Sequence, residues 1–130
     1  MAGDERLERR KRRAVAFYEQ MFTEGEPREA VERYVGGTYT QHNPHVPDGK
    51  EAFISYFEEM AAAYPDKEVH VHRTIAEDNL VVLHCEQVWP GDDDHAAIDI
   101  FRFDEDDRIV EHWDALQPIP DEIAHGNGMF

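Results

Sequence analysis

The hydrophobic period of the sequence changes once, near Lys67, from a period typical of helices to one typical of strands. Before this point apolar residues recur every three or four positions, as on one side of an amphipathic helix. After it they alternate with polar residues, as in strands that bury one face. Helices grouped before an antiparallel meander are typical of an α+β domain. We therefore expect three N-terminal helices packed in the concavity of a curved, mostly antiparallel sheet.

The helical part contains three periodic segments separated by glycine and proline residues, which interrupt helices. The segments cover about residues 4–23, 27–35 and 49–64. Residues 39–49, between the second and third segments, hold two prolines and a glycine, so we expect an irregular loop with polar side chains. Loops of this kind often carry functional residues.

The second half contains four alternating stretches, which predict four strands separated by acidic turns. They cover residues 68–76, 80–89, 95–104 and 108–116. A chain of 130 residues has the usual size of one domain, and the sequence has no internal repeat or linker. We expect a single domain over residues 1–130, in which the loop-like tail 121–130 is partly flexible.

The chain is strongly acidic, which limits the partners that it can bind. Aspartate and glutamate outnumber lysine and arginine by 29 to 13, giving a formal net charge of −16. Six basic residues lie together between Arg6 and Arg13, and we interpret them as the solvated face of the first helix. Because an acidic surface repels phosphate backbones, we expect no nucleic-acid partner. The acidic balance would suit a salt-rich cytoplasm, and a protein that unfolds as salt is raised would refute this halophile hypothesis.

Two further features concern the cellular compartment. No apolar run approaches the ~20 residues that cross a bilayer, and no apolar segment follows the basic cluster as in a secretory signal. The one cysteine, Cys85, lies in an apolar stretch, so we interpret it as a small core residue in a reducing compartment. We therefore expect a cytoplasmic protein without a membrane partner.

Alternation within the strands places several polar side chains among apolar ones. Asp99 shares a strand face with Phe101 and Phe103, and Asp114 shares one with Val110 and His112. A carboxyl group among aromatic side chains loses hydration, which raises its pKa toward the range useful for acid/base chemistry. The two acids could then share a proton or divide the roles of acid and base. The alternative, ordinary hydrogen-bonded strand residues, is the more frequent case for spacing of this kind.

Alternation leaves two points open. His84 and Glu86 share one face of the strand 80–89, opposite Leu83 and Cys85, but alternation does not say which face lines a cavity. In the last strand Ile109 and Trp113 should lie on the face opposite Asp114, where they could pack against a second sheet in a homodimer.

The last two strands also carry a family resemblance. The runs Ile98–Phe103 and Ile109–Asp114, joined by an acidic turn, resemble the closing hairpin of the SnoaL-like polyketide cyclases, within the nuclear transport factor 2-like superfamily. The loop Gln41–Pro44, followed by Gly49-Lys50, is similar to the family's pocket loop. The helix order and the four strands match as well, so the resemblance covers nearly the whole chain. It implies a cone-shaped α+β barrel, a small-molecule substrate, no cofactor and a homodimer formed through the sheet face.

The resemblance also assigns residues. Asp114 matches the aspartate that acts as acid/base in the cyclases, and Asn43 matches a polar position of the pocket loop. Asp99 departs from the pattern, because cyclases that close anthracycline-type rings carry histidine there, which puts the same aromatic substrate in doubt. Among the histidines we favour His84 and His42 as partners. The candidate catalytic residues are Asp114, Asp99 and His84, and the candidate substrate-binding residues are His42, Asn43, His45, Glu86, His112 and Phe101, with no metal ligand.

We expect a cofactor-free acid/base enzyme for a small carbonyl-containing or polyketide-like substrate. Asp114 would abstract a proton next to a carbonyl, while donors such as His84, His42 or Asn43 hold the enolate and Asp99 relays the proton. The same groups would serve an aldol-type cyclisation, an isomerisation, a dehydration or an epoxide hydrolysis.

Two alternatives remain open. His70 and His72 lie on one strand face with Glu77 five residues later, as in a metal motif, although the glycines that flank such motifs are missing. The domain could also be a non-catalytic binding or dimerisation module, because fold alone does not fix function. An enzyme needs an inward carboxylate beside a cavity, and a pairing module needs neither.

Overall fold

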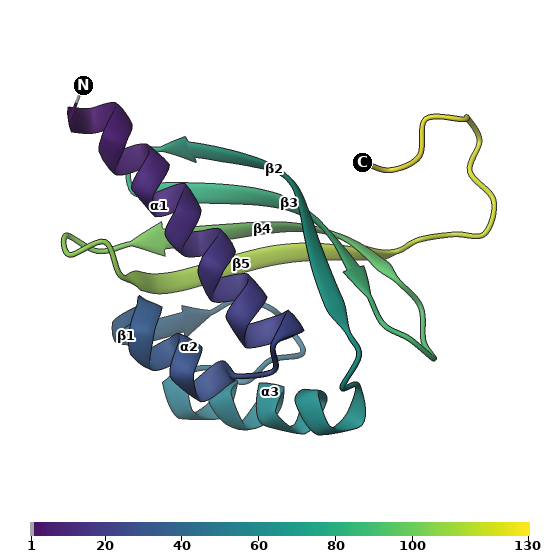
Figure 1. Cartoon of the computed structure of the whole chain (residues 1–130), viewed down its shortest axis with the longest axis horizontal. Helices are drawn as coiled ribbons and strands as arrows, with labels where there is room; N and C mark the ends of the chain where they lie inside the picture. Colours follow the sequence, from purple (N-terminus) through teal and green to yellow (C-terminus); the bar gives the residue numbers. More distant parts are fainter. Residues whose placement is uncertain (1) are drawn as a thin grey trace.

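The computed structural model describes residues 2–130, which form helices on one face of a five-stranded sheet (Figure 1). In chain order the elements are α1 (Ala2–Tyr18), the π-helical turn η1 (Glu19–Thr23), α2 (Pro27–Tyr34), β1 (Val35–Gln41), α3 (Lys50–Ala63), β2 (Glu68–Glu77), β3 (Leu80–Val88), β4 (His95–Phe103) and β5 (Ile109–Pro118). None of the described helices is long and apolar enough to cross a membrane.

The sheet has the strand order β1-β5-β4-β3-β2 and does not close into a barrel. Strands β2 to β5 form an antiparallel meander, and β1 pairs in parallel with β5. Helix α1 crosses the concave face of the sheet, while α2 and α3 lie beside β1 (Figure 1). The expected α+β architecture, with helices in the concavity of a curved, mostly antiparallel sheet, is confirmed. We call the face toward the helices the inner face and the opposite one the outer face.

Strand β1 is the element that the sequence did not predict. Residues 35–41 were expected to end a helix and begin a loop, since Gly36 and Gly37 have no preference for strand. The strand exists because it pairs with β5, and this pairing needs Gly36. A β-carbon at that position would lie 2.7 Å from an Asp104 carboxylate oxygen and 2.8 Å from Val110. Only glycine permits so close an approach.

The core lies between α1 and the inner face. Phe17, in the last turn of α1, is fully buried and packs on Phe53 of α3 and Phe101 of β4, with ring centroids 5.9 Å apart in both pairs. Cys85 on β3 is fully buried beside them, and burial raises the pKa of its thiol. It therefore acts as a small core residue, as predicted. The π-helical turn extends α1 and buries Met21 and Phe22 at the same side of the core.

The basic cluster of α1 is only partly a solvated face, which corrects the interpretation made from the sequence: Arg9 and Arg12 are exposed, whereas Arg10 is buried. Arg6, Arg9 and Arg10 all donate side-chain hydrogen bonds to the carboxylate of Asp107, over 2.9–3.0 Å, and Arg13 donates to its backbone oxygen. Asp107 lies in the turn between β4 and β5 with a φ of 58°. These four arginines therefore attach the first helix to the tip of the hairpin.

A bulge in β5 changes the predicted faces at the start of that strand. Arg102 pairs with Glu111 and Phe103 pairs with Ile109, so Val110 is an extra residue. Both Ile109 and Val110 are buried. The prediction that Ile109 lies on the outer face with Trp113 is therefore wrong, because simple alternation fails at a bulge.

Beyond Pro118 the chain contains no helix or strand. It leaves the sheet and turns back toward it (Figure 1). The ring of Phe130 stacks on that of His72 on the outer face, with ring centroids 4.5 Å apart.

Candidate active site

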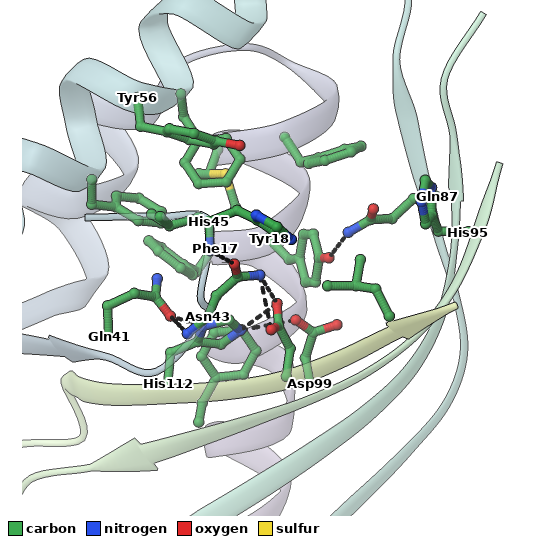
Figure 2. A pocket seen from close by; sticks show the side chains of 18 of the residues that line it. Phe17, Tyr18, Gln41, Asn43, His45, Tyr56, Gln87, His95, Asp99 and His112 are labelled. Carbon is green, nitrogen blue, oxygen red and sulfur yellow. Dashed lines mark hydrogen bonds and ion pairs between the residues drawn. The ribbon is translucent and has the colours of Figure 1, made fainter. Parts of the chain in front are cut away.

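A cavity of about 400 Å³ lies between the helices and the inner face of β3, β4 and β5 (Figure 2). Its walls are largely aromatic, formed by Phe17, Tyr18, Phe22, Tyr39, Phe53, Tyr56, Phe57, Trp89 and Phe101. Its polar groups are Gln41, Asn43, His45, Gln87, His95, Asp99, His112 and Asp114. A concave, mostly apolar site with a few converging polar groups is the usual form of a small-molecule site.

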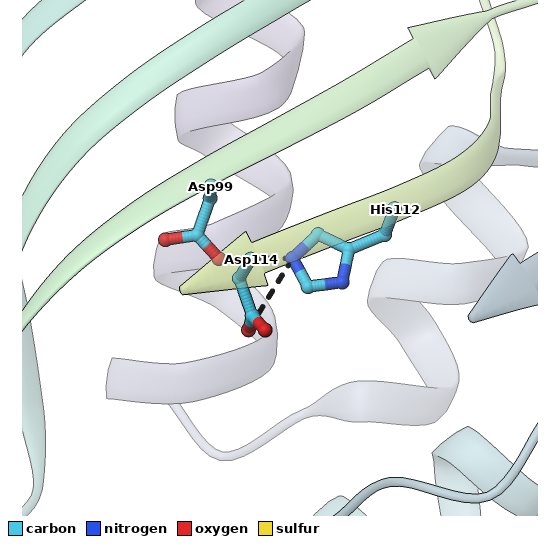
Figure 3. A group of neighbouring side chains, drawn as sticks. All are labelled: Asp99, His112 and Asp114. Carbon is cyan, nitrogen blue, oxygen red and sulfur yellow. Dashed lines mark hydrogen bonds and ion pairs between the residues drawn. The ribbon is translucent and has the colours of Figure 1, made fainter. Parts of the chain in front are cut away.

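Two acids and a histidine converge on the sheet side of this cavity (Figure 3). Asp99 and Asp114 are direct partners across β4 and β5, and His112 precedes Asp114 by two residues on the same face. The Nε2 atom of His112 lies 2.9 Å from Asp99 Oδ1 and 3.7 Å from Asp114 Oδ2. Asp99 is 1% exposed and His112 is 7% exposed. Three titratable groups thus share one buried location.

The environment of Asp99 favours its protonated form. Burial raises the pKa of this carboxyl group, and the hydrogen bond between Asp99 and His112 opposes the effect without cancelling it. One oxygen, Oδ2, is buried without a hydrogen-bond partner among the described residues. If the carboxyl group were ionised, this buried oxygen would carry negative charge without a hydrogen-bond partner, which costs free energy. The protonated form of Asp99 is therefore favoured.

The loop after β1 orients Asp114. The amide nitrogen of Asn43 donates to both carboxylate oxygens of Asp114, each over 2.9 Å (Figure 2). The amide oxygen of Asn43 accepts from the backbone N–H of His45 over 2.8 Å, so the amide cannot be turned around. Asn43 therefore fixes the direction in which the carboxylate faces the cavity.

One known protein family matches most of the chain. A family profile described as the SnoaL-like domain matches residues 14–112. The chain belongs to the SnoaL-like family. The match begins near the end of α1 and ends at His112, so it includes the pocket loop and leaves Asp114 outside.

Solved structures show the same fold. One is a candidate polyketide cyclase from Acidithiobacillus ferrooxidans, 22% identical, with a TM-score of 0.71 over 82% of this chain and 87% of that one. Another is IdmH from Streptomyces antibioticus, also a candidate polyketide cyclase, 18% identical, with a TM-score of 0.65 over 82% and 91%. A third is AclR from Streptomyces galilaeus, a candidate hydroxylase, 16% identical, with a TM-score of 0.67 over 85% and 90%. The search of curated proteins found no match.

Several residues predicted for the site line the cavity of this SnoaL-like protein. They are Asp99, Asp114, Asn43, His45, His112 and Phe101. His112 was expected to contact the substrate, whereas the structure places it between the two acids.

The two histidines favoured from the sequence lie elsewhere. His84 and Glu86 are on the outer face, where His84 contacts Arg73 and Glu86 contacts His72. The inner positions of β3 are Val81, Leu83, Cys85 and Gln87, which face the helices and the cavity, so His84 and Glu86 between them face outward. His42 stacks on Trp113 with ring centroids 5.0 Å apart, outside the cavity lining. We therefore leave His84, Glu86 and His42 out of the proposed site.

The histidines of the metal alternative are also on the outer face. His70 contacts Glu68 over 3.1 Å, and His72 contacts Glu86 over 3.3 Å, so each pairs with its own glutamate. Among the described residues, the group with ligand atoms within 4.8 Å of one another is Asp99, His112 and Asp114. If the protein binds a metal ion, the geometry favours the buried cluster over His70 and His72 as its site.

Some lining residues were missed in the sequence. Gln87 lies on the same face of β3 as Leu83 and Cys85, in steps of two residues. The alternation of the strand could therefore have predicted that Gln87 faces inward. Its amide donates to the Tyr18 hydroxyl over 2.6 Å. Gln41 could not have been found in this way, because its position depends on the unpredicted strand β1.

Proposed function

We propose that this SnoaL-like protein is a cofactor-free acid/base enzyme acting on a small carbonyl-containing or polyketide-like substrate. The observation that carries the proposal is the buried cluster of Asp99, His112 and Asp114 at the wall of an aromatic cavity. A cavity of about 400 Å³ lies within the range of small-molecule sites, roughly 300 to 1,000 Å³. Its aromatic walls suit a flat, largely apolar molecule.

Asp114 is the proposed base. Its carboxylate faces the cavity, and Asn43 holds both oxygens in place. The C–H bond next to a substrate carbonyl breaks, the proton goes to Asp114, and the electron pair moves onto the carbonyl oxygen to give an enolate. From this enolate the substrate can close a ring on its own second carbonyl, return the proton at another carbon, or expel a β-hydroxyl group as water.

Tyr18 is the proposed donor for the enolate. The Tyr18 hydroxyl accepts from Gln87, which leaves its own proton to donate. Burial raises the pKa of Tyr18 well above its ordinary value, so the phenol stays protonated at neutral pH. Donors that are already oriented in a dry site stabilise developing charge more than water does.

The test is proton exchange, which needs no knowledge of the final product. A panel of 1,3-diketones and aromatic β-ketones is incubated with the protein in D₂O, and loss of the α-proton signal is followed by NMR. We expect the wild type to accelerate exchange for some members and Asp114→Asn to lower the rate by about 10²- to 10⁴-fold, the usual contribution of a general base. Asp106→Asn, the same change at an exposed turn, is the control.

Three outcomes separate the possibilities. Loss of exchange in Asp114→Asn but not in Asp106→Asn supports the proposal. Equal exchange in wild type and Asp114→Asn refutes Asp114 as the base. Binding of these compounds in the cavity without any exchange would instead support the alternative, a non-catalytic binding module.

We also propose that the protein is cytoplasmic and that it forms a homodimer through the outer face of the sheet. Ile98 is 41% exposed there, and the half-buried Trp113 lies on the same face. Light scattering after size-exclusion chromatography measures the mass directly, and a mass of one chain at micromolar concentration would refute the dimer.

A further inference from the structure

Gln41 contacts His112 on the side opposite to Asp99. Strand β1 pairs with β5 so that Gln41 is the register partner of His112, and the backbone N–H of His42 donates to the His112 carbonyl over 3.1 Å. This pairing brings the Gln41 amide oxygen to 2.7 Å from His112 Nδ1 (Figure 2).

The orientation of the Gln41 amide is determined by its other contacts. Its oxygen, Oε1, accepts from the backbone N–H of His42 over 3.1 Å and from that of Asn43 over 3.0 Å. Backbone N–H groups can only donate. If the amide were turned around, its NH₂ group would face both of these donors, which is unfavourable. The atom next to His112 Nδ1 is therefore an oxygen.

An amide oxygen can only accept, so His112 Nδ1 must carry a hydrogen. The ring is then either the neutral Nδ1–H tautomer or the imidazolium. In both forms the atom that gains or loses a proton is Nε2, which lies 2.9 Å from Asp99 and 3.7 Å from Asp114. In the neutral form Nε2 accepts a hydrogen bond, so the proton between these two groups resides on Asp99.

We propose that Gln41 is a positioning residue that fixes a hydrogen on His112 Nδ1 and so makes Nε2 the atom that exchanges a proton with Asp99 and Asp114. Through Gln41 the site divides its roles. Asp114, held by Asn43, takes the substrate proton, and the pair of Asp99 and His112 holds one proton to deliver. The catalytic part of this inference rests on the proposed function, and the tautomer does not.

The groups that face the His112 ring come from every element around it. Asp99 and Phe101 lie on β4, Asp114 follows on β5, and Tyr39 of β1 stacks against the ring with centroids 6.4 Å apart. The phenol of Tyr39 stays neutral, because burial raises its pKa. The titratable groups that remain to face the ring are therefore the two acids.

The test reads the tautomer directly in the protein without substrate. Long-range ¹H–¹⁵N NMR of histidine-labelled protein distinguishes a protonated from an unprotonated ring nitrogen. For the wild type we expect the neutral ring of His112 to carry its hydrogen on Nδ1 and none on Nε2. A neutral His112 with its hydrogen on Nε2 would overturn the inference, whatever the variants do.

Two variants separate a positioning role from a structural one. Gln41→Glu keeps an acceptor at Nδ1, so we expect it to retain the Nδ1–H tautomer. Gln41→Leu removes the acceptor, so we expect the Nε2–H tautomer to appear and kcat for exchange to fall by about 10²-fold with little change in KM. Gln117→Leu, at an exposed position of β5, is the control for loss of an amide.

The results distinguish this inference from the proposed function. If Gln41→Leu keeps the wild-type tautomer, the inference is wrong. If the tautomers behave as expected but no compound undergoes exchange, Gln41 still positions His112 and only the proposed enzyme activity fails.

Discussion

Replacing Asp107 by asparagine tests what attaches the first helix to the sheet. The carboxylate accepts hydrogen bonds from Arg6, Arg9 and Arg10. Asparagine has nearly the same size and tolerates the positive φ of 58° at this position. The substitution Asp107→Asn therefore removes the negative charge and leaves the turn conformation in place.

The expected loss of stability follows from the pKa of Asp107. Burial alone would raise this pKa, but the hydrogen bonds from Arg9, Arg6 and Arg10 outweigh burial and lower it from 3.8 to about 2. A difference of about 1.8 between folded and unfolded pKa values corresponds to about 2.4 kcal/mol at neutral pH. Arg6 and Arg9 have side chains 41% and 49% exposed, so solvent screens part of this energy. We expect Asp107→Asn to lose about 1 to 2 kcal/mol.

Urea denaturation across pH measures this difference. Because the folded pKa is depressed, the charge stabilises the wild type fully above about pH 4, and the effect is lost as the pH falls through about 2. The gap between wild type and Asp107→Asn should therefore be largest at pH 5 to 7 and shrink below pH 4. Asp106→Asn, in the same turn but exposed, should change stability by less than about 0.5 kcal/mol. This role of Asp107 would be refuted if Asp107→Asn were as stable as the wild type at pH 7, or if the difference in their free energies of unfolding did not depend on pH.

Two other substitutions test the sheet and the site. Gly36→Ala should destabilise the protein by about 1 to 3 kcal/mol in thermal melts, since its β-carbon would clash with Asp104 and Val110. Gly37→Ala is the control, because the space at that position is open. Equal effects of the two substitutions would contradict this account. Asp99→Asn should be more stable than the wild type at pH 8 but not at pH 4, because burial raises the pKa of Asp99 and the wild type loses stability as this group ionises. Urea titrations at both pH values decide this, and a difference that does not grow with pH counts against it.

The sequence predicted the site only in part, and the reason differs from residue to residue. Alternation placed Asp99 and Asp114 on one face each, and a short turn made their strands neighbours, so these two could be found together. His112 shares the face of Asp114, but sequence alone gave no reason to prefer it over His84 or His42. The choice between faces depends on which side the helices cover, which is not a local property.

The sequence by itself determined the three helices and the four-stranded meander, because hydrophobic period and turn residues act over a few neighbouring positions. Tertiary structure alone decided β1, since its pairing with β5 joins Val35 to Ile109, far apart in the chain. It also decided the outward place of His84 and the inward place of Ile109 at a bulge. Gln41 reaches His112 only through that pairing. Contacts between distant segments, which no local pattern encodes, therefore complete the site.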